Sequence, residues 1–109
     1  MSTNFRDEKL KDQIMKWAAD YLQRESSGAS LITVTNVILA YEAKEATILI
    51  TVLPDSKQEA ALEFARRQLS EFREYMTKKI KTGRMPYFHI DIDRGEKHRQ
   101  RIDEITIKN

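Results

Sequence analysis

The stretch ATILITVLPDSKQE, residues 46–59, holds the main turning point of the chain. Residues Ala46 to Leu53 are rich in β-branched and aliphatic side chains and predict a strand. Pro54 ends that strand, because proline has no amide hydrogen to donate to a ladder. The next residues, Ser56-Lys57-Gln58-Glu59, match a capping box and predict the start of a helix. The chain therefore passes from a strand directly into a helix.

The predicted helix is the longest periodic pattern in the sequence. Apolar residues recur at helical spacing along one stripe: Leu62, Ala65, Leu69, Phe72, Met76 and Ile80. Gly83 suits the C-cap of this helix. Pro86 then opens a last strand, Tyr87 to Asp93, in which every second side chain is apolar. A strand, a long helix and a further strand in this order form a crossover unit.

The residues before this unit predict a helix and a hairpin strand. A stripe of Leu10, Ile14, Trp17, Ala18, Tyr21 and Leu22 predicts a helix from about Arg6 to Glu25. A loop at 26–30 leads to a strand from Leu31 to Tyr41, with Ile32, Val34, Ile38 and Ala40 expected on one face. A short turn at 42–45 joins it to the strand at 46–53 as an antiparallel hairpin.

The order helix, strand, strand, long helix, strand predicts an α+β fold, with the helices packed on one face of a three-stranded sheet. A chain of 109 residues builds one domain, so residues 1–109 are assigned to a single domain with a polar tail from about 94 to 109. The chain has no cysteine and no apolar stretch of the ~20 residues that cross a membrane. Charges from Arg6 to Asp12 argue against a signal peptide, and we expect a cytoplasmic, monomeric protein.

Positive charge is concentrated in the second half of the long helix and just past it. Residues 66–84 carry two acidic side chains and seven basic ones, whereas the net charge of the whole chain is only +2. The basic residues are Arg66, Arg67, Arg73, Lys78, Lys79, Lys81 and Arg84. Such a patch favours a phosphate backbone as partner. The alternative interpretation is a solvated helix face, since Lys and Arg are good helix formers. Lys79 is the weaker candidate because helical spacing places it across the apolar stripe.

Catalytic and metal chemistry find little support in the residues. With only three glycines, the chain cannot build a phosphate-cradling loop or a dinucleotide fingerprint. His89, Asp91 and Asp93 share one face of the last strand, as a divalent metal site would require. The same alternation is typical of any half-buried strand, and we favour that interpretation. We expect no enzyme activity, cofactor, metal ion or small-molecule substrate.

Four stretches are similar to the bacterial ribosome-binding factor A family. They are Ile32–Val37, Ala46–Leu53, the run Lys78–Lys81 before Pro86-Tyr87-Phe88, and Arg101–Ile105, in the order and spacing of that family. The resemblance implies a type II KH-like fold. It also implies a non-enzymatic assembly factor that binds the small ribosomal subunit and its rRNA late in maturation, often with greatest need in the cold.

In this family an Ala-x-Gly kink divides the long helix, and that kink aligns with Gln68-Leu69-Ser70. Because Ser70 replaces the glycine, we expect at most a modest bend here. The resemblance implies that Ser70 marks a close approach of backbone to RNA, so it joins the seven basic residues as a candidate site residue. The competing hypothesis is a protein-binding adaptor that recruits its partner through the tail or the hairpin edge, with the basic flank only solubilising.

Overall fold

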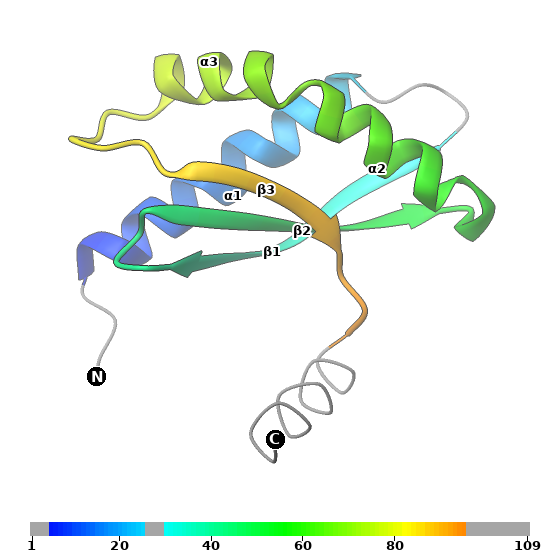
Figure 1. Cartoon of the computed structure of the whole chain (residues 1–109), viewed down its shortest axis with the longest axis horizontal. Coiled ribbons are helices and arrows are strands. Elements are labelled where there is room, and N and C mark those ends of the chain that lie inside the picture. Colours follow the sequence, from blue (N-terminus) through cyan, green and yellow to red (C-terminus); the bar gives the residue numbers. More distant parts are fainter. Residues whose placement is uncertain (1–4, 26–29, 96–109) are drawn as a thin grey trace.

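The computed structural model describes residues 5–25 and 30–95. The elements are α1 (Phe5–Glu25), β1 (Leu31–Ala40), β2 (Glu45–Leu53), a 3-10 turn (Asp55–Lys57), α2 (Gln58–Arg67), α3 (Leu69–Lys79) and β3 (Tyr87–Ile92), as Figure 1 shows. This order confirms the predicted α+β arrangement. The tail beyond residue 95 and the loop at 26–29 lie outside the described residues. None of the described helices is both long and apolar enough to span a bilayer.

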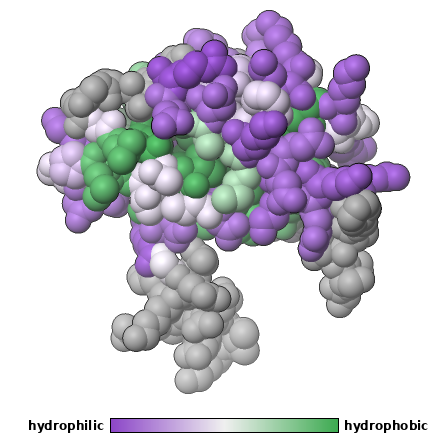
Figure 2. Space-filling model, turned by 180° about the vertical axis from the view of Figure 1, so that it is seen from behind, coloured by the Kyte–Doolittle hydropathy of each residue, from purple (hydrophilic) through white to green (hydrophobic). Residues whose placement is uncertain are grey.

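The three strands form one sheet in the order β1-β2-β3, with β1 antiparallel and β3 parallel to the central β2. Alternate side chains of β2 and β3 point to the helices and are buried: Ala46, Ile48, Ile50 and Val52, and Phe88, Ile90 and Ile92. They join buried residues of α1, α2 and α3 in a single hydrophobic core. Polar side chains occupy much of the outer surface, although a hydrophobic area interrupts it on one side (Figure 2). The helices therefore pack as one layer against the buried face of the sheet.

A β-bulge changes which residues of β1 face the core. Pairing with β2 shifts by one residue between Val34 and Asn36, so the side-chain alternation is reversed beyond this point. Ile32 is buried before the bulge and Val37 after it, whereas Ile38 is 41% exposed. The expectation that Ile38 and Ala40 continue the inward face of Ile32 is therefore wrong. A period-two pattern cannot reveal an inserted residue when both faces carry aliphatic side chains.

Both predicted ends of the long helix need correction. Ser56 lies in the 3-10 turn, and no side-chain hydrogen bond caps α2 in the described structure, so the capping box does not form. The backbone begins the turn instead, with the Lys57 amide donating to the Pro54 carbonyl over 2.9 Å. At the other end α3 stops at Lys79, and Ile80 is already extended, before the expected cap at Gly83 is reached. Lys81 and Arg84 therefore lie on the segment that links α3 to β3.

The long helix divides at Gln68, inside the segment that aligns with the family's kink. Gln68 departs from helical geometry (φ −101°, ψ 11°), and its amide donates to the Ala65 carbonyl over 3.1 Å, one residue short of the α-helical partner. The expectation of at most a modest bend is therefore wrong, because the α-helical ladder is broken at Gln68, although no described residue of this segment has a positive φ. The Tyr21 hydroxyl donates to Gln68 Oε1 over 3.1 Å, which ties the break to α1.

The turn between β1 and β2 is strained. Tyr41, Glu42 and Ala43 have φ values of 53°, 57° and 64°, so three successive residues with side chains adopt the left-handed conformation. Such a conformation costs about 1–2 kcal/mol per residue, because Cβ crowds the following carbonyl. The turn is closed by the Lys44 amide, which donates to the Tyr41 carbonyl over 3.1 Å.

Replacing Ala43 by glycine should raise the free energy of unfolding by about 1 kcal/mol, because glycine adopts this conformation without the Cβ penalty. The matched control is Ala60→Gly on the exposed surface of α2, which should lower the free energy by roughly 0.5–1 kcal/mol. Urea unfolding of the two variants measures both values. Destabilisation by both substitutions would contradict the strained turn.

Candidate RNA-binding surface

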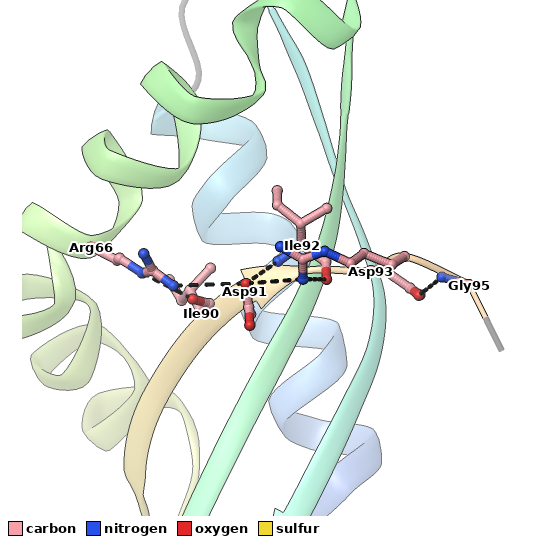
Figure 3. A network of polar contacts seen from close by, with 7 residues as sticks. Arg66, Ile90, Asp91, Ile92, Asp93 and Gly95 are labelled. Atoms are coloured by element: carbon pink, nitrogen blue, oxygen red, sulfur yellow. Dashed lines mark hydrogen bonds and ion pairs between the residues drawn. The ribbon is translucent and has the colours of Figure 1, made fainter. Parts of the chain in front are cut away.

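Two arginines of the predicted patch bind the chain itself. Arg66 of α2 donates from Nε to the Ile90 carbonyl over 3.1 Å, and its guanidinium lies 3.7 Å from Asp91 Oδ1 (Figure 3). Arg73 of α3 donates to the Pro86 carbonyl over 2.5 Å and to the Met85 carbonyl over 3.1 Å. β3 is an edge strand, so one of its sides has no neighbouring strand. The Ile90 carbonyl faces that open side, and the Met85 and Pro86 carbonyls belong to residues that come before the pairing with β2. Arg66 and Arg73 therefore cap the free edge of β3.

The remaining predicted residues are exposed on the solvent side of the helices and the link that follows. Four of them have side chains that form no hydrogen bond or ion pair with any residue that the structure describes: Arg67, Lys78, Lys81 and Arg84. Ser70 is also exposed. Glu71 and Glu74 lie between Arg67 and Lys78 on exposed positions, so the patch is not continuous along the helix. Its positive charge gathers at the end of α3, in a C-terminal basic cluster of Lys78, Lys79, Lys81 and Arg84.

Lys79 stands where α3 meets α1, and not in the core. Its Nζ lies 5.0 Å from the centroid of the Trp17 ring and 5.6 Å from that of Tyr75. Lys16 contacts the same indole at 4.8 Å. Cations over aromatic rings are attracted by the ring quadrupole, so these contacts hold Lys79 in place while its side chain remains exposed. Trp17 packs partly against the core, as the sequence predicts, and also carries cations on the surface.

A polar cluster joins α1 to α3 farther along the same seam. The Tyr75 hydroxyl donates to Asp20 over 2.5 Å, and Arg24 donates to Asp20 and to the Tyr75 oxygen over 2.8 Å each. The hydrogen bond from Tyr75 and then the one from Arg24 lower the pKa of Asp20, which is exposed. Burial raises the pKa of Tyr75. The stabilisation from Asp20 is therefore present above its ordinary pKa and fades as the pH falls through the lowered value.

The three candidate metal ligands, which are His89 and Asp91 on β3 and Asp93 just after it, have different partners. His89 Nε2 lies 3.0 Å from Glu45 Oε1 on β2. Asp91 Oδ1 lies 3.7 Å from a guanidinium nitrogen of Arg66 (Figure 3), and a guanidinium nitrogen of Arg94 is also 3.7 Å from it. Asp93 accepts hydrogen bonds from the Thr35 hydroxyl and the Gly95 amide. No group of three metal-ligating side chains converges within residues 5–25 and 30–95. These side chains hold the strand edges together in the described structure.

Sequence reasoning left out two cations of α1 that lie at the C-terminal basic cluster. Arg6 and Lys9 line the same hollow as Lys81, at the end of the molecule where α1 begins and α3 is linked to β3. The available signal was their spacing of three residues, which puts both on one side of α1. That spacing did not show which end of α3 this side of α1 would meet.

The family model for ribosome-binding factor A matches residues 6–106. The chain belongs to the ribosome-binding factor A family. It is 24% identical over 106 residues to ribosome-binding factor A of Natranaerobius thermophilus, across 94% of this chain and 81% of that protein. The family is named for ribosome binding and not for a catalysed reaction.

Solved structures of the family share the fold. The crystal structure of ribosome-binding factor A from Thermus thermophilus has a TM-score of 0.69 and 17% identity, covering 78% of this chain and 92% of that one. A homology model of the Thermus thermophilus factor fitted into a cryo-EM map of a 30S complex has a TM-score of 0.69 and 18% identity, over 80% of this chain and 94% of that one. The KH-like fold that the resemblance implies is confirmed.

Replacing Arg73 by methionine should lower the free energy of unfolding by about 1–3 kcal/mol, because two charge-assisted hydrogen bonds to the residues just before β3 are lost while the apolar stem is kept. Arg67→Met is the matched control and should change the free energy by less than about 0.5 kcal/mol. Urea denaturation measures both. Equal effects at the two positions would contradict a structural role for Arg73.

Proposed function

We propose that this protein is an assembly factor that binds the small ribosomal subunit through its rRNA, late in the maturation of that subunit. The family to which the chain belongs supports ribosome binding, and the 30S complex of a structural relative supports the small subunit as target. The protein would act by binding alone, as a monomer in the cytoplasm, without a cofactor or small-molecule substrate. A role in growth at low temperature is part of the same proposal.

The observation that carries this proposal is the set of exposed cations left over after internal pairing. Arg67, Lys78, Lys81 and Arg84 carry charges that no described residue neutralises, and Lys79 is held at the surface beside them. Exposed cations gathered at one end of a domain attract a phosphate backbone and release its counterions on binding. Phosphate contacts of this kind position the protein on RNA without reading its bases.

We assign two kinds of role to the candidate residues. Arg67 and the C-terminal basic cluster would contact phosphates, and Ser70 would mark the close approach of the RNA to the helix break at Gln68. Arg66 and Arg73 act mainly as positioning residues, because their guanidinium groups are used at the β3 edge. Their remaining exposure lets them support a phosphate contact as well.

One observation favours the adaptor as a second candidate function. Leu31 and Leu53 are paired partners at one end of the β1–β2 hairpin, and they are 52% and 60% exposed. Large apolar side chains side by side on an open sheet face suit a protein partner. The two functions differ in their response to salt, because apolar docking strengthens as salt rises whereas phosphate contacts weaken.

Sedimentation with purified ribosomal subunits tests the proposal. The protein should co-migrate with small subunits and dissociate as salt rises, with a slope of log affinity against log salt near −2 to −4 for roughly three to five phosphate contacts. Arg67→Glu with Lys78→Glu should weaken binding and flatten this slope. The control, Lys11→Glu with Lys57→Glu, reverses the same amount of charge at two positions that belong neither to the cluster nor to the described lining of the hollow beside it. Equal losses in both double variants, or binding that ignores salt, would refute the proposed surface.

A further inference from the structure

A hollow of about 760 Å³ opens between the first turns of α1 and the segment that links α3 to β3. Arg6, Lys9 and Lys81 supply three cations to its lining, and no carboxylate of the described residues lines it. In Figure 1 the start of α1, this link and the β1–β2 turn meet at one end of the molecule. The same end, on the right of Figure 2, is covered mainly by hydrophilic side chains.

The helix geometry of α1 explains how these side chains come together. Counted from Arg6, the residues Lys9, Leu10 and Gln13 lie three, four and seven positions farther on, so all four share one side of the helix. The opposite wall exists because α3 ends at Lys79. Ile80 is extended and buried, which anchors the link, while Lys81 and Thr82 stay exposed at the hollow. Of the site residues predicted from the sequence, Lys81 alone is among the described residues that line this hollow.

We propose that this hollow binds one unpaired nucleotide of the RNA, with Arg6, Lys9 and Lys81 around its phosphate. This proposal rests on the proposed function and adds a contact from α1 to it. The lining matches the parts of a nucleotide: three cations for the phosphate, the Gln13 amide and the Thr82 hydroxyl for polar edges, and Leu10 for an apolar contact with the base. Single-stranded segments are where proteins receive individual splayed-out bases, whereas a duplex keeps its bases stacked.

The neighbouring hollow defines the limit of this site. It measures about 740 Å³ and shares Arg6, Leu10, Lys81 and Thr82 with the first, but Asp7 and Glu42 also line it. Carboxylates repel a phosphate at short range. The phosphate therefore sits on the side of Lys9 and Gln13, and Arg84, which lines only the second hollow, meets the next part of the backbone.

Binding of a short, labelled single-stranded RNA of mixed sequence tests the proposal. Arg6→Glu with Lys9→Glu should weaken binding roughly tenfold or more and reduce the magnitude of the salt slope by about 0.7–1.4, because one or two phosphate contacts are lost. Acidic residues in the first turns favour the helix macrodipole, so α1 should remain folded, and thermal unfolding of the variant checks this. The Lys11→Glu, Lys57→Glu double variant should stay within about twofold of the unchanged protein.

Free 5′-AMP is the second probe, since it carries the same chemical groups. It should bind far more weakly than the RNA while shifting the NMR signals of Lys81 and Thr82. AMP binding as tight as RNA binding would assign the hollow to free nucleotides and overturn the proposal. Equal losses in the two double variants, or an Arg6→Glu, Lys9→Glu variant that binds RNA normally, would overturn it too. If the RNA binds as expected but small subunits do not, only the proposed function fails.

Discussion

The attachment of α2 and α3 to the free edge of β3 is the constraint on which the rest of the surface depends. Arg66 and Arg73 are seven residues apart, about two helical turns, and they reach carbonyls at opposite ends of the strand region from Met85 to Ile90. These bonds cover an edge that would otherwise invite pairing with another chain. They also fix the path of the link that carries Lys81 and Arg84.

This attachment divides the cations of the long helix by role. Those on the flank beside β3 serve the fold, while those on the solvent side and at the helix end remain available to a partner. Glu71 and Glu74 interrupt the solvent side, so available charge accumulates at the end of α3 and not along its length. The start of α1 lies at the same end, which lets Arg6 and Lys9 enlarge the surface. A local excess of charge in a sequence therefore does not measure the charge that a nucleic acid can use, because the fold pairs some of these cations and brings in others from elsewhere in the chain.

Periodicity was enough to predict the elements, their order and most of the core. The stripe from Leu62 to Ile80 and the alternation in β3 are strong signals because burial imposes them directly. The predictions from the sequence failed where backbone geometry, and not side-chain burial, determines the local structure. The bulge in β1 turns Val37 toward the core and Ile38 toward solvent. The left-handed turn at Tyr41–Ala43 contains no glycine, so the sequence gives no sign of it. The helix break at Gln68 formed without glycine or proline, and the family resemblance, not the local sequence, indicated its place.

The candidate site was predictable in composition but not in contacts. Residues 66–84 contain the exposed cations, yet the sequence could not tell that Arg66 and Arg73 would bind carbonyls 12 to 24 positions away. Helical spacing places Lys79 across the apolar stripe from Arg66 and Arg73, and its side chain lies on that side, at the seam with α1. The sequence could not show that Trp17 of α1 would contact it there. Long-range partners of long side chains depend on packing that no local pattern records.

Site-specific photocrosslinking on the isolated small subunit tests the central claim most directly. A photoreactive residue in place of Lys78 should crosslink to the rRNA of that subunit, because the proposed function puts the C-terminal basic cluster against its backbone. The same residue in place of Lys57, at the far end of the crossover, should give no RNA crosslink. Crosslinks from position 78 to ribosomal proteins alone, or equal RNA crosslinks from both positions, would contradict the account.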